Sequence, residues 1–207
     1  MIEIKGSVSL SFNFPASLPV AYAFYRDMSR TVHFLPHIST VYQYNLDEYR
    51  MLYSTTELGI YRVRLFCDLC ISPASTERLL KIVPIEDKPP VQTEFGIYSL
   101  TAQGYYASES IFHAEGEQTR IDYLLALSAR LPVPIGIRFM PDSVLNSIAS
   151  SITQWRIHEI AQGFINRSVA AFNLENQRDA RWQFEHLSTL VPFETSEPDD
   201  TIGLILE

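Results

Sequence analysis

The chain has 207 residues, 46% of them hydrophobic and 19% charged, which suits one globular domain with a sizeable core, with or without a tail. Its net charge of −8 is uneven, because residues 175–207 hold eight acids and two bases, whereas residues 1–174 hold sixteen acids and fourteen bases. A nearly neutral body without a basic run argues against nucleic-acid binding. The N-terminus lacks an apolar signal core, and no stretch reaches the roughly 18 apolar residues of a membrane-spanning helix. We therefore expect a soluble, cytoplasmic protein.

The chain starts with a predicted strand and two short helices. Residues 3–12 alternate between apolar and polar side chains, which is typical of a half-buried strand. Ser17 stands where a helix cap is needed, and apolar residues then recur every four positions, so a helix of about ten residues is predicted. Residues 30–36 form a second short helix or turn, which Pro36 ends.

Six further strands follow, separated by turn residues and by one proline-containing loop from residue 86 to about residue 103. They are predicted at residues 39–45, 50–57, 60–71, 78–85, 104–113 and 119–131. In the strands 60–71 and 119–131, one face is uniformly apolar and the other is mixed. An antiparallel sheet that is covered on one side requires this pattern. The sequence thus indicates a seven-stranded antiparallel sheet with one dry face.

A long amphipathic helix is predicted from residue 142 or 143 to about residue 172. Its apolar stripe comprises Val144, Leu145, Ile148, Ile152, Trp155, Ile160 and Phe164. Gly163 interrupts the helix at a cost of about 1 kcal/mol relative to Ala, which suggests a close approach to the sheet. Because no other long amphipathic element is available, we expect the sheet to curl around this helix. Residues 1–175 would form this α+β domain, followed by an acidic tail at 176–207 that is partly helical or disordered.

The order of elements resembles that of the START-like, or polyketide cyclase/Bet v 1-like (SRPBCC), superfamily, whose architecture is the helix-grip fold. Three segments carry the resemblance: Phe-Asn-Phe-Pro-Ala-Ser at 12–17, Thr-Arg-Ile-Asp-Tyr at 119–123 and Leu-Pro-Val-Pro at 131–134. The last two also look like those of an uncharacterised START-like family of oxygenic phototrophs. The resemblance covers about residues 3–174 and leaves the tail outside.

What the resemblance implies is a deep cavity between sheet and helix for lipids, pigments, isoprenoids, polyketides or similar molecules. Most relatives bind or carry such ligands, and some catalyse reactions on them; no catalytic residue and no cofactor is transferred to this chain. The ligand-binding residues that we predict combine the dry strand faces, the helix stripe and two carboxylates. They are Tyr53, Glu57, Tyr61, Val63, Tyr123, Leu125, Ile148, Ile152, Trp155 and Glu159.

The sequence contains no motif that is specific for catalysis or metal binding. Cys67 and Cys70 have a Cys-x-x-Cys spacing, but on a strand two residues three apart point to opposite faces, so two free thiols are expected. His33 and His37 have the spacing of helical metal ligands, but Pro36 lies between them and no nearby acid or cysteine completes a site, so we do not expect a metal site there. Glu57 is a candidate for a buried carboxylate, which could orient a ligand hydroxyl or act as a base if its pKa were raised.

Three functions remain open at this stage. The first is binding or transport of a small hydrophobic ligand, the second is a cyclase or hydrolase that uses Glu57 or Glu159, and the third is an assembly role for the long helix and the tail. Whether the protein is an enzyme is left open, with binding favoured. Peripheral membrane contact is considered for the apolar loop before the helix, through Ile135, Ile137, Phe139 and Met140.

Overall fold

The computed structural model describes residues 1–57, 59–72, 78–133 and 140–187, with side chains up to residue 178. Residues 1–170 form one compact unit, and residues 171–207 form a second one. The first unit contains the sheet, the short helices and the first part of the long helix, so the candidate site is built within it.

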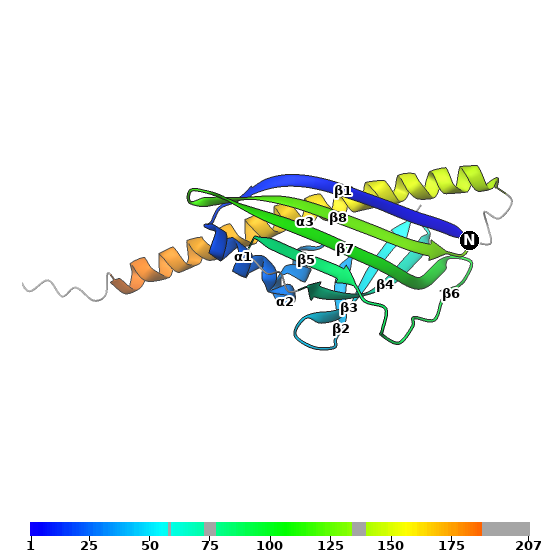
Figure 1. Ribbon diagram of the computed structural model, residues 1–207, viewed down its shortest axis with the longest axis horizontal. Helices are drawn as coiled ribbons and strands as arrows, with labels where there is room; N and C mark the ends of the chain where they lie inside the picture. Colours follow the sequence, from blue (N-terminus) through cyan, green and yellow to red (C-terminus); the bar gives the residue numbers. More distant parts are fainter. Residues whose placement is uncertain (58, 73–77, 134–139, 188–207) are drawn as a thin grey trace, which may run out of the picture. The chain divides into compact units, whose positions relative to one another are not determined.

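One sheet of eight strands dominates the first unit, among the described residues (Figure 1). Its order is β1 (Ile2–Phe14), β8 (Gln118–Leu131), β7 (Ser99–Glu115), β5 (Leu79–Pro84), β4 (Tyr61–Ser72), β3 (Glu48–Glu57) and β2 (Ile38–Gln43), and the short β6 (Glu94–Phe95) pairs with β7. The seven predicted strands are all present. The sheet also includes β6 and a β7 that begins at Ser99, because part of the predicted 86–103 loop joins the sheet.

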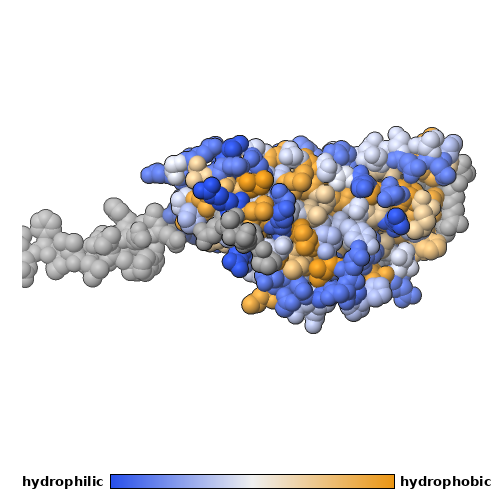
Figure 2. All heavy atoms as spheres, viewed as in Figure 1, coloured by the Kyte–Doolittle hydropathy of each residue, from blue (hydrophilic) through white to orange (hydrophobic). Residues whose placement is uncertain are grey.

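Pairing is antiparallel except where β7 runs parallel to β4, from Arg62–Phe66 beside Ser99–Gln103. β7 thus pairs with β4 at its start and with β5 nearer its end. The outer face of the sheet is mixed in polarity, with apolar and polar side chains interspersed (Figure 2). Leu124 and Ile111 are partly exposed there, so this face meets solvent while the opposite face forms the core.

Three short helical segments connect β1 to β2: α1 (Leu18–Arg26), α2 (Met28–Thr31) and the 3-10 turn η1 (Val32–Phe34). Ser17 holds the predicted N-cap position of α1, although its side chain makes no capping hydrogen bond. Asp27 caps α2, since its Oδ1 accepts a 3.2 Å hydrogen bond from the Arg30 amide. The predicted helix or turn at 30–36 corresponds to the end of α2 and η1.

The long helix α3 spans Asp142–Leu187 and extends beyond the predicted end near residue 172. Within the first unit it crosses the sheet on its inner face (Figure 1). Ile157 and Ile160 of α3 share a cavity with Leu69 of β4 and Leu125 of β8, so the dry faces of both strands look at this helix. The central expectation from the sequence, a sheet wrapped against one long helix, is confirmed.

The core-facing side of α3 differs from the predicted stripe. Leu145, Ile160 and Phe164 are buried as expected, but Ile148 is 40% and Trp155 is 58% exposed, and Val144 is exposed as well. The buried positions instead continue through Thr153, Ile157, Ala161, Ile165 and Ser168. The predicted stripe was too wide because hydropathy alone cannot separate apolar residues on the core side of a helix from those on its flank.

Candidate functional site

The interior between the sheet and α3 encloses a cavity of about 20 Å³. Its walls come from five strands, the segment before β2 and α3, and they are almost wholly apolar. The lining residues are Leu35, Ile38, Met51, Tyr53, Cys67, Leu69, Tyr106, Leu125, Leu127, Ile157 and Ile160. This space is about one water molecule in size, well below the roughly 300 Å³ of a small-molecule pocket. Among the described residues, leucine, methionine and tyrosine side chains fill most of this space, so it is not the deep open cavity expected from the resemblance.

The polar atoms of this wall are the hydroxyls of Tyr53 and Tyr106 and the Cys67 thiol. Burial raises the pKa of Cys67 to about 12, helped by the negative charge of Asp68. Burial also raises the pKa of Tyr53, and the nearby Glu57 carboxylate adds to that shift. All three groups are therefore neutral near pH 7. The wall offers weak, uncharged hydrogen-bonding groups inside an apolar lining.

The structure places the ten predicted ligand-binding residues in different surroundings. Tyr53 and Leu125 line the cavity. Tyr123 is buried but is not among the lining residues, and its hydroxyl lies 3.3 Å from that of Tyr106. Three others are half-buried outside the lining, namely Tyr61, Val63 and Ile152.

Ile148 and Trp155 do not line the interior, because both are exposed on the flank of α3. The Trp155 ring instead faces Arg156, whose guanidinium carbon lies 4.3 Å from the ring centroid. Sequence reasoning missed most of the wall. The alternation of β3 contained a signal for Met51, and the dry face of β4 already included Cys67 and Leu69. Leu35 and Ile38 flank a turn and gave no periodic signal.

A charged cluster, here called the rim cluster, joins β3, α3 and the segment just before β2; it consists of Glu57, Arg156, Glu159 and His37. Arg156 donates from Nε to Glu57 Oε1 (2.9 Å), from Nη2 to Glu57 Oε2 (3.2 Å) and from Nη1 to Glu159 Oε2 (2.6 Å). His37 Nε2 lies 3.4 Å from Glu159 Oε1. The two predicted carboxylates, 102 positions apart in the chain (159 − 57), are thus held by one arginine.

The rim cluster keeps the Glu159 carboxylate ionised and lowers its pKa. Burial tends to raise the pKa of Glu159, but hydrogen bonds from Arg156 and His37 outweigh this, and the net shift is downward. Burial tends to lower the pKa of Arg156, and its hydrogen bonds to Glu57 and Glu159 raise it overall. Because a general base works best with a pKa near the operating pH, Glu159 is unsuited to that role in this arrangement.

Cys67 and Cys70 are free thiols, the first buried and the second half-buried, as their opposite strand faces predict. No cluster of three or more His, Cys, Asp or Glu side chains that could hold a metal ion occurs among the described residues. Nor does any helix in the described part of the chain have the length and apolar character needed to cross a bilayer. Of the loop considered for membrane contact, Ile135, Ile137 and Phe139 lie outside the described residues, and Met140 is half-buried.

No protein-family model and no curated protein matches the chain. Solved structures do. The Zhui aromatase/cyclase from Streptomyces sp. R1128 is similar with a TM-score of 0.50 and 9% identity, over 81% of this chain and 93% of its own. The di-domain ARO/CYC protein StfQ of the steffimycin pathway has a TM-score of 0.50 and 11% identity, over 84% of this chain and 52% of its own.

The chain has the helix-grip fold. The order of elements and the sheet packed on the long C-terminal helix establish it, together with the likeness to the two aromatase/cyclases. The protein TTHA0849 from Thermus thermophilus is a further similar structure, with a TM-score of 0.49 and 18% identity over 80% of this chain and 99% of its own. At these identities the likeness concerns the fold, and the chemistry has to come from the residues of this chain.

Proposed function

We propose that the protein binds a small, largely apolar ligand between the inner face of the sheet and α3. The observation that carries this proposal is the character of the enclosed wall, where eight aliphatic or thioether side chains surround two tyrosine hydroxyls and one thiol. A wall of this kind favours a lipid-, pigment-, isoprenoid- or polyketide-like molecule with one or two polar atoms. The shared fold with two aromatase/cyclases supports the same location.

Binding requires the interior to expand from its cavity of about 20 Å³. Met51 is the wall residue best suited to move, because its unbranched side chain changes shape at little cost. Leu35 is also suited to move, since it lies in the connection before β2 and outside the hydrogen-bonded sheet. The central leucines and isoleucines of β4, β8 and α3 would keep their positions and grip the ligand.

A catalytic function is the weaker alternative. It is suggested by the aromatase/cyclases of the same fold, but it needs a cavity carboxylate with a raised pKa. Glu159 has a lowered pKa and a 2.6 Å ion pair with Arg156. The assembly alternative depends partly on residues 188–207, which lie outside the described residues.

A fluorescence titration with the uncharged probe N-phenyl-1-naphthylamine tests the proposal. Leu125→Phe fills the cavity from β8, and Leu124→Phe makes the same change on the opposite, partly exposed face of that strand. We expect saturable binding of one probe per chain to the wild type and to Leu124→Phe. Leu125→Phe should weaken binding by about tenfold or more, because overpacking removes the space that the probe needs.

Circular dichroism and thermal melting establish that both variants are folded, and Ile160→Phe provides a second filling variant from α3. The proposal fails if the wild type binds no probe saturably, or if folded Leu125→Phe and Ile160→Phe bind it as tightly as the wild type.

A further inference from the structure

Two neighbouring turns at one end of the sheet expose large apolar side chains. Ile60 lies in the turn between β3 and β4, and Phe95, Ile97 and Tyr98 lie at the turn between β6 and β7. Each of the four is between 51% and 66% exposed. We call these four residues the turn patch. Soluble proteins rarely expose several large apolar residues together unless the surface has a binding role.

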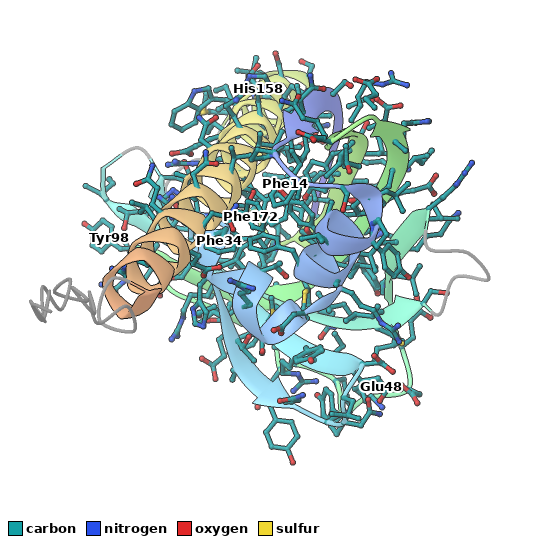
Figure 3. The ribbon with its side chains drawn as sticks, turned by 90° about the vertical axis from the view of Figure 1, so that its left-hand side faces the viewer. Phe14, Phe34, Glu48, Tyr98, His158 and Phe172 are labelled. Atoms are coloured by element: carbon teal, nitrogen blue, oxygen red, sulfur yellow. The ribbon has the colours of Figure 1, made fainter. Side chains whose placement is uncertain are left out.

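The backbone holds the two turns side by side. The Arg62 amide donates a 2.9 Å hydrogen bond to the Tyr98 carbonyl, and Arg62 is the register partner of Ser99 in the parallel β4–β7 pair. Within the second turn, the Gly96 amide donates a 2.7 Å hydrogen bond to the Ser99 carbonyl. Figure 3 shows Tyr98 projecting away from the ribbon. The turn patch is therefore a fixed feature of the fold.

Two arginines flank the turn patch on the outer face of β4. Arg62 and Arg64 are exposed, and neither has an ion pair among the described residues. Glu94, in β6, is separated from Arg64 by Thr101 of β7, which is the register partner of both residues. Guanidinium groups without a carboxylate partner are well suited to bind phosphate oxygens.

We propose that the turn patch docks on the surface of an anionic lipid bilayer. Ile60, Phe95 and Ile97 would enter the boundary between headgroups and acyl chains, Tyr98 would sit at headgroup level, and the two arginines would contact lipid phosphates. A bilayer surface suits this arrangement because the exposed apolar side chains and the amphipathic Tyr98 stand at the turns, with two cationic side chains beside them on β4. The proposal does not depend on ligand binding in the interior.

Co-sedimentation of the full chain with lipid vesicles tests this docking. The vesicles contain phosphatidylcholine alone or with about one third phosphatidylglycerol, which supplies the negative surface charge. The test variants are Ile97→Ser/Tyr98→Ser and Arg62→Gln/Arg64→Gln. The control is Leu46→Ser/Tyr42→Ser, which removes exposed apolar residues around a different turn, between β2 and β3, where Leu46 is 83% exposed.

We expect the wild type and the control to bind the anionic vesicles more strongly than the neutral ones. Ile97→Ser/Tyr98→Ser should lower the partition coefficient by about tenfold or more, through the apolar area it withholds from the bilayer. Arg62→Gln/Arg64→Gln should remove most of the preference for anionic vesicles, at about fivefold for each arginine.

The proposal is overturned if the wild type does not sediment with either kind of vesicle, or if the control variant loses as much binding as Ile97→Ser/Tyr98→Ser. Size-exclusion chromatography tests the alternative that a second copy of the chain covers the turn patch. A concentration-dependent dimer that disappears in Ile97→Ser/Tyr98→Ser would show that a second copy of the chain covers the turn patch, and would also overturn the proposal.

Discussion

Asp68 is a buried carboxylate on the face of β4 that the sequence assigned to water. Its two oxygens accept 2.7 Å hydrogen bonds from Arg50 Nε and Nη2, and Tyr44 donates to it at 3.0 Å. The chain after β5 covers this carboxylate. The Ile85 amide donates a 3.0 Å hydrogen bond to the Asp68 backbone carbonyl, and Arg50 Nη2 donates a 2.6 Å hydrogen bond to the Pro89 carbonyl. Burial acts to raise the pKa of Asp68, but the bonds from Arg50 and Tyr44 prevail and the pKa is lowered.

This arrangement predicts a stabilising contribution that depends on pH. Because the pKa of Asp68 is lower in the folded state than the roughly 3.9 of an unfolded chain, the contribution is complete above about pH 4 and is lost as the pH falls through the folded-state pKa. Asp68→Asn should therefore lower the free energy of unfolding by about 3 kcal/mol at pH 7, and the gap to the wild type should narrow at pH 3.

Urea denaturation at pH 7 and pH 3 measures both effects. Asp122→Asn is the matched control, since Asp122 also has hydrogen-bonded and charged partners but is about one third exposed, and its replacement should cost less. An Asp68→Asn variant with wild-type stability at pH 7, or with the same acid dependence as the wild type, would contradict the role given to Asp68.

At the scale of the elements, α3 packs closely against the rest of the unit at Gly163. The sequence placed this approach against the sheet, but the neighbour is Pro36, in the connection between η1 and β2. A Cβ atom at position 163 would overlap Pro36 Cγ and lie 3.3 Å from Pro36 Cδ. The glycine thus lets α3 and the wall segment that carries Leu35 and Ile38 pack together.

Gly163→Ala is expected to destabilise the protein by about 1–3 kcal/mol, because the clash with the rigid proline ring outweighs the roughly 1 kcal/mol that alanine gains in a helix. Ser150→Ala, at an exposed position of the same helix, should leave stability unchanged or raise it by up to about 0.5 kcal/mol. Thermal and urea unfolding measure the stability of both variants relative to the wild type. A Gly163→Ala protein more stable than the wild type would show that Pro36 yields easily.

The elements were predictable where their signal is local. Alternation in β4 and β8 and the long amphipathic run of α3 set the fold, because each pattern depends on residues a few positions apart. The parallel pairing of β4 with the start of β7 had no such signal, since it joins segments 37 positions apart (99 − 62) through backbone bonds alone. The ion pair of Glu57 with Arg156 was not predictable either, because the two residues are far apart in the sequence and meet only when α3 lies on β3.

At the scale of the whole molecule, the fold does not determine the volume of the interior. The sheet and α3 form the helix-grip fold and enclose an apolar lining, yet the enclosed space is about 20 Å³. Tyr53 and Leu125 were predictable as part of that lining from the strand faces, whereas its volume depends on how all eleven side chains pack. Binding of a ligand in this interior therefore requires the space between the sheet and α3 to widen when the ligand enters.

Native mass spectrometry of the protein purified from its own host, under gentle ionisation, tests this claim most directly. We predict a population that carries one additional small molecule per chain, of apolar character, which is released on unfolding and is absent from the Leu125→Phe variant. Recovery of the bare chain alone, or an adduct that Leu125→Phe retains in full, would contradict the claim that the interior between sheet and helix is the binding site.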